Sequence, residues 1–147
     1  NLRQPSCRVY RTSAQSIPNN SQTVLSFTTA RHDTMSAINP MWTVGDPTHV
    51  MVRTPGIYIV TALVEFAANG TGERTVAIFD TASNQFFAID ERVAVSGDST
   101  DITCSSGPFY VPAASSFQVY VFQNSGGALN VDASPAYTPE LAVAMIG

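Results

Sequence analysis

The sequence contains no lysine. Its seven cationic side chains apart from histidine are all arginines, against eleven acidic residues, which gives a formal net charge of −4. No run of basic residues is present that could follow a phosphate backbone or an anionic bilayer surface, so a nucleic-acid partner and a membrane-surface role are disfavoured. The longest apolar stretch, residues 56–64, is short and interrupted, and we expect no membrane insertion.

Charged residues of either sign are scarce. They make up 12% of the chain, about half of the ~25% typical of a globular domain. A chain of 147 residues has the size of one domain and can bury about 70% of its unfolded surface. We therefore expect a single domain over residues 1–147. The shortage of charge indicates that part of the surface is covered, most simply by further copies of the chain.

Cysteine is also rare. The two cysteines, Cys7 and Cys104, lie almost a chain length apart, which excludes a CxxC redox motif and a zinc knuckle. One disulfide could join them, but we favour two small buried thiols. The sequence has neither an initiator methionine nor a signal peptide, and we expect a mature product or a piece excised from a longer protein.

Helical periodicity is missing as well. Proline and glycine recur at short intervals, and β-branched and aromatic residues cluster between them. We predict an all-β, two-sheet antiparallel jelly-roll sandwich of about ten strands. A long polar connection is expected over 29–47 and a hairpin turn at 69–72. The predicted strands are 7–13, 22–28, 49–53, 57–66, 74–80, 86–92, 101–110, 117–123 and 140–146.

The segment 57–66 is apolar on both of its faces. Alternate side chains of a strand point to opposite faces, and an antiparallel strand with one solvated face should carry polar residues there. Here the alternation leaves apolar residues on both sides, and the segment 140–146 repeats the pattern. The predicted core positions are Tyr58, Val60, Phe66, Phe117, Val119 and Leu141.

The second apolar face needs a cover, because exposed apolar patches of this kind mark interaction sites. We predict that further copies of the chain provide the cover, through an interface formed by Ile57, Ile59, Leu63, Ala142, Ala144 and Ile146. The alternative is that other segments of the same chain lie over this face.

Several segments resemble one known superfamily. Residues 53–60, Arg-Thr-Pro-Gly-Ile-Tyr-Ile-Val, resemble the proline-x-glycine-x-tyrosine-x-phenylalanine signature of the complement-q and tumour necrosis factor-like jelly rolls. Val60 stands where that superfamily prefers an aromatic residue. Residues 25–31, 117–127 and 139–141 are similar to an early strand and to the last two strands. The resemblance implies a ten-stranded jelly roll, usually a homotrimer whose threefold axis is lined by the outer face of the two-sided strands.

The bacterial and bacteriophage branch is the most similar. Residues 9–11, 16–19 and 123–129 are similar to sequences that recur in minor tail and fibre proteins. This implies a non-enzymatic trimeric binding module, extracellular or on the virion surface, that recognises a host-surface glycan or protein. A structural virion protein, such as a capsid decoration trimer that clamps neighbouring virion proteins, is the alternative.

The residue pattern offers little for catalysis or metal binding. His32-Asp33 resembles a polarised base, but neighbouring residues of a strand face opposite ways, and no nucleophile has a suitable context. Two isolated histidines make no zinc motif, and the acids near Asp98 lack a DxDxDG-type calcium loop. We therefore expect no catalytic residue, no metal and no cofactor.

Loops at one end of the barrel are where we expect a ligand. The candidates are Trp42, Met41 and His32 in the connection 29–47, and Asp98 in the loop 96–101. Trp42 is the only tryptophan, and it could stack on a sugar ring or another apolar partner. The alternative, which we favour slightly, is that Trp42 closes the end of the barrel.

Overall fold

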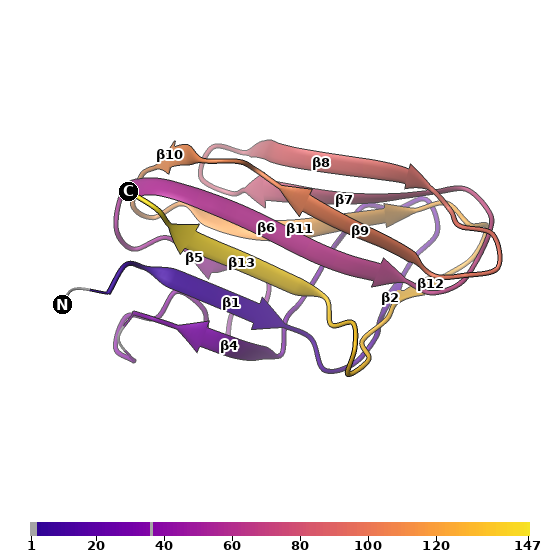
Figure 1. Cartoon of the computed structure of the whole chain (residues 1–147), viewed down its shortest axis with the longest axis horizontal. Coiled ribbons are helices and arrows are strands. Elements are labelled where there is room, and N and C mark those ends of the chain that lie inside the picture. The colour runs from indigo at the N-terminus through magenta and orange to yellow at the C-terminus, as the bar shows by residue number, and fades with distance from the viewer. Residues whose placement is uncertain (1–2, 36) are drawn as a thin grey trace.

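The computed structural model describes residues 3–35 and 37–147 (Figure 1). These described residues form thirteen strands and no helix. The strands in chain order are β1 (Ser6–Tyr10), β2 (Gln15–Ile17), β3 (Thr23–Val24), β4 (Thr29–Asp33), β5 (Val50–Met51), β6 (Gly56–Phe66), β7 (Glu73–Asp80), β8 (Gln85–Val93), β9 (Thr100–Ser105), β10 (Phe109–Val111), β11 (Ser116–Gln123), β12 (Leu129–Val131) and β13 (Glu140–Met145).

The strands lie in two antiparallel sheets packed face to face, which confirms the predicted all-β, two-sheet fold (Figure 1). The larger sheet has eight strands in the order β2-β12-β6-β13-β1-β4, and β9 and β10 also pair with β6. The smaller sheet has five strands in the order β3-β11-β7-β8, and β5 also pairs with β11. The eleven-residue strand β6 thus has four partners and holds the larger sheet together.

The inner faces of the two sheets enclose the core. Every second residue of β6 from Tyr58 to Phe66 is buried, as the alternation of a strand requires. The hydroxyl of Tyr58 donates a hydrogen bond to the carbonyl oxygen of Thr54 at 2.7 Å, so the ring is buried without an unpaired polar group. The six predicted core residues are all fully buried: Tyr58, Val60, Phe66, Phe117, Val119 and Leu141.

Gly56 opens β6 where the end of the chain approaches it closely. A Cβ atom on Gly56 would lie 2.7 Å from the carbonyl oxygen of Gly147. The N–H of Ile57 donates to that same oxygen at 2.7 Å, which holds the two segments together. The close approach of this backbone accounts for the glycine, because any side chain here would collide with it.

The first strands differ from those predicted. The segment 7–13 leaves the strand conformation after Tyr10, and within 22–28 only Thr23 and Val24 pair as a strand. Residues 29–33 form β4, although we expected them in a polar connection. β4 pairs with β1 at the edge of the larger sheet, where a strand needs no apolar alternation, so its polar sequence resembled a loop.

The segment 69–72 does not close the predicted hairpin. β6 and β7 belong to different sheets, so the chain crosses from one layer to the other here. Arg74 is fully buried and fixes this crossing, because its guanidinium donates to the carbonyl oxygens of Asn69 at 2.7 Å and Thr71 at 2.9 Å. The Asn-Gly-Thr-Gly segment therefore connects a strand of the larger sheet to a strand of the smaller sheet.

Two further differences occur in the second half of the chain. The predicted strand 101–110 is divided into β9 and β10 by a turn in which Gly107 has φ +67°. β12 lies in a segment for which we predicted no strand, because three residues are too few to show a periodic pattern.

Cys7 and Cys104 are free thiols and both are buried, which confirms the interpretation that we favoured. They lie on β1 and β9, with β13 and β6 between these strands in the sheet. Three strand spacings of ~4.8 Å put them roughly 14 Å apart, beyond the reach of a disulfide.

Candidate functional site

The outer face of the larger sheet is open. Figure 1 views this face, and no segment of the chain crosses in front of β6, β13 and β1. Alternate residues of β6 from Ile57 to Glu65 point outward and are partly exposed, as are Ala142 and Ala144 of β13. No covering segment of the kind required by the alternative interpretation lies over it in the described parts of the chain.

One half of this face is apolar. Ile59 lies opposite Ala144, and Ile57 lies opposite Tyr110 of β10. Ile146 belongs to the same end of the sheet, since its N–H donates to the carbonyl oxygen of Ile57 at 2.8 Å, and it is 49% exposed. Four of the six predicted interface residues therefore lie together in what we call the apolar half: Ile57, Ile59, Ala144 and Ile146.

The other half of the face is polar, which corrects the expectation of an apolar surface along its whole length. Leu63 lies directly opposite Glu140, and Ala142 lies directly opposite Arg8. These two predicted interface residues thus have charged neighbours. We call this region the polar half; its residues are Arg8, Arg31, Thr61, Leu63, Thr103, Thr138, Glu140 and Ala142.

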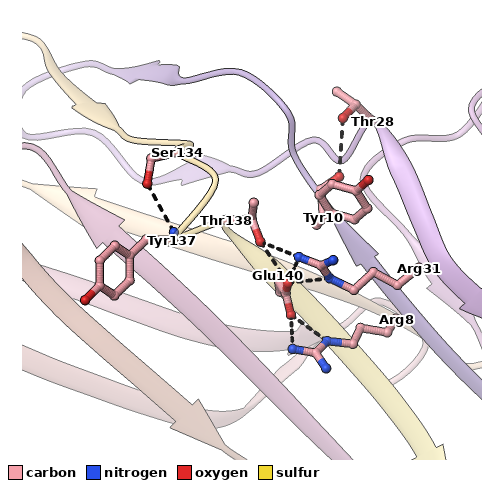
Figure 2. A network of polar contacts seen from close by, with 8 residues as sticks. All are labelled: Arg8, Tyr10, Thr28, Arg31, Ser134, Tyr137, Thr138 and Glu140. Atoms are coloured by element: carbon pink, nitrogen blue, oxygen red, sulfur yellow. Dashed lines mark hydrogen bonds and ion pairs between the residues drawn. The ribbon is translucent and has the colours of Figure 1, made fainter.

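Glu140 is the centre of the polar half (Figure 2). It is only 6% exposed, and Nε of Arg8 donates to its Oε2 at 2.5 Å while Nε of Arg31 donates to its Oε1 at 2.7 Å. The hydroxyl of Thr138 donates to Oε1 at 2.8 Å. Burial alone would raise the pKa of Glu140, but the hydrogen bonds from Thr138, Arg31 and Arg8 outweigh it and lower the pKa. The carboxylate is therefore ionised at neutral pH and holds both arginines in place.

Two positive charges meet one negative charge in this network. The side chains of Arg8 and Arg31 are 47% and 43% exposed, whereas that of Glu140 is 7% exposed. The guanidinium carbon of Arg31 also lies 4.3 Å from the ring centroid of Tyr10, in a cation–π contact that Figure 2 shows from close by. One surplus positive charge is thus fixed on the surface of a chain that is acidic overall.

Sequence reasoning missed this network, and no local signal could have found it. The chain separates Arg8 from Glu140 by 132 positions and Arg31 from Glu140 by 109 positions. Only the pairing of β1 with β13 and with β4 brings the three side chains together.

A hollow of about 230 Å³ lies beside the network. Its lining includes Arg8, Thr61, Leu63, Thr103, Glu140 and Ala142. At this level β13 is paired with both β1 and β6, and β6 is paired with both β13 and β9. The backbone polar groups of β13 and β6 under the hollow are consequently used within the sheet, and an occupant above these two strands would meet their side chains.

Acidic residues follow beyond the polar half. Glu65 lies directly opposite Asp101 on β9, and the N–H of Asp132 donates to the carbonyl oxygen of Glu65 at 2.9 Å. Burial raises the pKa of Glu65, and a hydrogen bond with Asp101 and the charges of Asp101, Asp132 and Asp98 raise it further. In the described ranges none of these four carboxylates forms an ion pair with a cation.

The four predicted ligand residues do not form one site. Trp42 and Met41 lie in the connection from β4 to β5, whereas Asp98 lies in the turn from β8 to β9, at the opposite end of the sandwich (Figure 1). His32 belongs to β4 rather than to a loop, and its Nε2 lies 2.8 Å from the hydroxyl oxygen of Ser6.

Trp42 is half-buried at one end of the sandwich. Its ring packs against the core, and its Nε1 donates to the carbonyl oxygen of Pro47 at 3.2 Å. Asp33 holds the adjoining backbone, because its Oδ2 accepts from the N–H of Met41 at 2.7 Å and of Trp42 at 3.2 Å. Met41 is itself buried in the core. This arrangement favours the interpretation in which Trp42 closes the end of the sandwich.

We found no group of three or more histidine, cysteine, aspartate or glutamate side chains able to hold a metal ion in residues 3–35 and 37–147. His32 and Asp33 have separate partners, since His32 contacts Ser6 and Asp33 binds the loop backbone. In the same residues no helix has the length and apolarity needed to cross a membrane.

No protein-family model matches the sequence, and no curated protein sequence matches it. Solved structures do match. Eiger TNF from S. frugiperda is similar with a TM-score of 0.65 at 11% identity, over 99% of this chain and 94% of that one. Murine APRIL at pH 8.0 is similar with a TM-score of 0.67 at 15% identity, over 98% and 100% of the two chains. The globular domain of zebrafish complement 1qA gives a TM-score of 0.56 at 14% identity, over 98% of each chain.

These similarities establish the fold as a jelly roll of the tumour necrosis factor and complement-q type. They confirm the fold that the resemblance of the proline-glycine-tyrosine segment at 55–58 implied. The finer resemblance to a bacterial or bacteriophage branch stays a prediction.

Proposed function

We propose that this protein is a non-enzymatic binding module that works as a homotrimer. The observation that carries the proposal is the open apolar half of the outer face, on a jelly roll of the tumour necrosis factor and complement-q type. Removing apolar surface from water contributes about 25 cal/mol per Å², so covering this half with another copy stabilises the assembly. The trimeric state is what the sequence resemblance implies.

In a threefold ring, one surface of each chain contacts a different surface of its neighbour. Each chain therefore needs a second contact surface, and the smaller sheet can provide it. Its edge strand β8 pairs only with β7 within the described residues. Ile89 and Val93 of β8 are 62% and 76% exposed. Each chain therefore carries a second exposed apolar surface that can meet the outer face of a neighbour.

We further propose that the module belongs to a phage or bacterial surface structure, where it recognises a host-surface glycan or protein. The segments 9–11, 16–19 and 123–129 support this placement through their similarity to tail and fibre proteins. The second candidate is a structural virion protein, such as a capsid decoration trimer. The exposed apolar edge of β8 favours it, because such an edge can also clamp a neighbouring virion protein.

The trimer is tested by two matched isoleucine variants. Ile59→Asp places a carboxylate in the apolar half, and three desolvated unpaired charges around one axis should yield monomers. Ile38 lies in the connection from β4 to β5 and is 96% exposed, so Ile38→Asp should leave the trimer intact. A trimer that survives Ile59→Asp contradicts this interface.

Two experiments on the trimer distinguish recognition of a host-surface ligand from a structural role in the virion. A glycan array should show binding to a defined host-surface glycan if recognition is correct, and immunogold labelling should place the protein at tail tips. Labelling spread over the capsid would favour the decoration trimer. Trp42→Ala adds a check on the predicted ligand residue: loss of stability without a specific loss of binding means that Trp42 only closes the sandwich.

A further inference from the structure

The polar half has the features of a prepared anion site. Guanidinium groups bind carboxylates through charge-assisted hydrogen bonds in a planar, forked geometry. A flexible surface arginine loses rotamer entropy when it binds, which weakens the interaction. Arg8 and Arg31 have already lost much of that freedom, because the buried carboxylate of Glu140 binds both of them. The guanidinium of Arg31 also lies over the ring of Tyr10.

Each of these arginines also keeps donors available. Arg8 uses Nε and Nη2 for Glu140, and Arg31 uses Nε and Nη2 for Glu140 and Thr138. The Nη1 group of neither arginine donates to any part of the chain that the structure describes. Arg8 lines the 230 Å³ hollow, and Arg31 is bound to the same carboxylate of Glu140, so the network places free N–H donors and one surplus positive charge beside the hollow.

We propose that the polar half is a binding subsite for a sugar unit that carries a carboxylate. The free N–H groups of Arg8, which lines the hollow, bind the carboxylate, and Arg31 on the far side of Glu140 adds the second positive charge. Thr61 and Thr103 line the hollow and supply hydroxyls for sugar hydroxyls, while Leu63 supplies an apolar wall for the ring.

The chemistry of the hollow favours a sugar over an acidic peptide. Peptides are commonly recognised through hydrogen bonds to their main chain, but the backbone groups of β13 and β6 under the hollow are already paired on both sides. What remains is side-chain hydroxyl and guanidinium groups, which match the hydroxyls and the carboxylate of an acidic sugar. At about 230 Å³ the hollow is smaller than the ~300–1,000 Å³ of pockets for whole drug-sized ligands, so it suits one unit of a longer glycan.

This inference rests on the proposed role in recognition, but it does not rest on the apolar half. The residues of the subsite lie toward Glu140 along the strands, and Ile57, Ile59 and Ile146 lie toward the opposite end. A variant or an experiment can therefore show loss of glycan binding without loss of the trimer, or the reverse.

The test is a titration of the folded protein with sodium glucuronate, followed by NMR chemical shifts, with glucose and acetate as reference ligands. Glucuronate should shift resonances of Arg8, Thr61 and Thr103, and it should bind more tightly than glucose or acetate. Arg8→Gln and Arg31→Gln should each weaken glucuronate binding about tenfold, the effect of losing a charge-assisted hydrogen bond. The matched control is Arg92→Gln, because Arg92 is 53% exposed and forms its ion pair with Asp90 elsewhere; it should bind like the wild type.

A thermal melt of each variant shows whether it is folded. If Arg8→Gln or Arg31→Gln fails to fold, Thr103→Val removes only a hydroxyl from the hollow and should still weaken glucuronate binding. The inference is overturned if glucuronate does not bind, if glucose or acetate binds equally well, or if Arg92→Gln weakens binding as much as Arg8→Gln. A wild-type trimer without glucuronate binding overturns this subsite alone, whereas a wild-type monomer overturns the proposed assembly.

Discussion

Leu63 and Glu140 lie directly opposite each other on the outer face of the larger sheet. Toward one end of the sheet from this pair the face becomes apolar, and around the pair two arginines converge on the buried carboxylate. The pair therefore lies at the boundary between two surfaces with different chemistry. The apolar half is suited to contact between copies of the chain, and the polar half is suited to a charged ligand.

Tyr58 should be among the residues on which folding depends most. Tyr58→Ala removes a fully buried ring and should lower the free energy of unfolding by about 3–5 kcal/mol. Tyr58→Phe keeps the ring and loses only the hydrogen bond to Thr54, so it should cost about 0.5–1.5 kcal/mol. Urea denaturation measures both, with Tyr137→Ala as the control, because Tyr137 is 49% exposed and lies away from the apolar half. Equal losses for Tyr58→Ala and Tyr137→Ala would show that β6 is misplaced.

Glu140→Ala should destabilise the protein at neutral pH, because it leaves two guanidinium groups without their shared carboxylate. Both guanidinium groups are partly solvated, which limits the loss to about 1–3 kcal/mol. Since the pKa of Glu140 is lowered on folding from its usual 4.5, its contribution is present above pH 4.5 and is lost as the pH falls through the lowered pKa.

The difference in unfolding free energy between wild type and Glu140→Ala should therefore shrink in acid. The control is Glu73→Ala, which removes an exposed carboxylate of β7. A difference that stays constant from neutral pH to strong acid would mean that the ion pairs do not stabilise the fold.

Glu65 should show the opposite dependence on pH. Its pKa is raised on folding from 4.5, so its contribution to stability is fully present below pH 4.5 and is lost as the pH rises through the raised pKa. Glu65→Gln removes the repulsion with Asp101 across the strands and should stabilise the protein at neutral pH by about 0.2–1 kcal/mol. Melting curves of Glu65→Gln and of the control Glu73→Gln, recorded from below pH 4.5 to neutral pH, test the claim. Loss of stability in Glu65→Gln at neutral pH contradicts it.

Cys7 and Cys104 should be unreactive in the folded protein. Burial, followed by the charge of Asp33, raises the pKa of Cys7 to about 12, and burial followed by the charge of Asp90 raises the pKa of Cys104. Little thiolate is present at neutral pH, and the thiolate is the reactive form. A thiol reagent should label neither cysteine in buffer and both in urea, as counted by mass spectrometry. Rapid labelling in buffer, or a mass that shows a disulfide, would contradict the buried free thiols.

The core was predictable from sequence because it depends on local alternation. Tyr58 and Phe66 are buried because every second residue of one strand faces inward, and that pattern is visible within ten residues. The long-range arrangement was not predictable. β4 carries the polar residues allowed at a sheet edge, and the crossing after β6 depends on the burial of Arg74 between the layers.

The candidate site was predictable only in part, for the same reason. Ile57 and Ile59 were found through the two-sided pattern of one strand. Arg8 and Glu140 are neighbours only because β1 pairs with β13, across 132 positions of the chain. Trp42 and Asp98 were grouped as loop residues, but loops carry no signal for which end of a sandwich they occupy.

Sedimentation equilibrium of the unmodified chain at micromolar concentration is the most direct test of the assembly. If three chains bury the apolar half between them, the measured mass should be three times that of one chain. The mass should be unchanged at half the concentration. A single-chain mass at these concentrations would mean that Ile57, Ile59 and Ile146 remain in water and that no trimer forms.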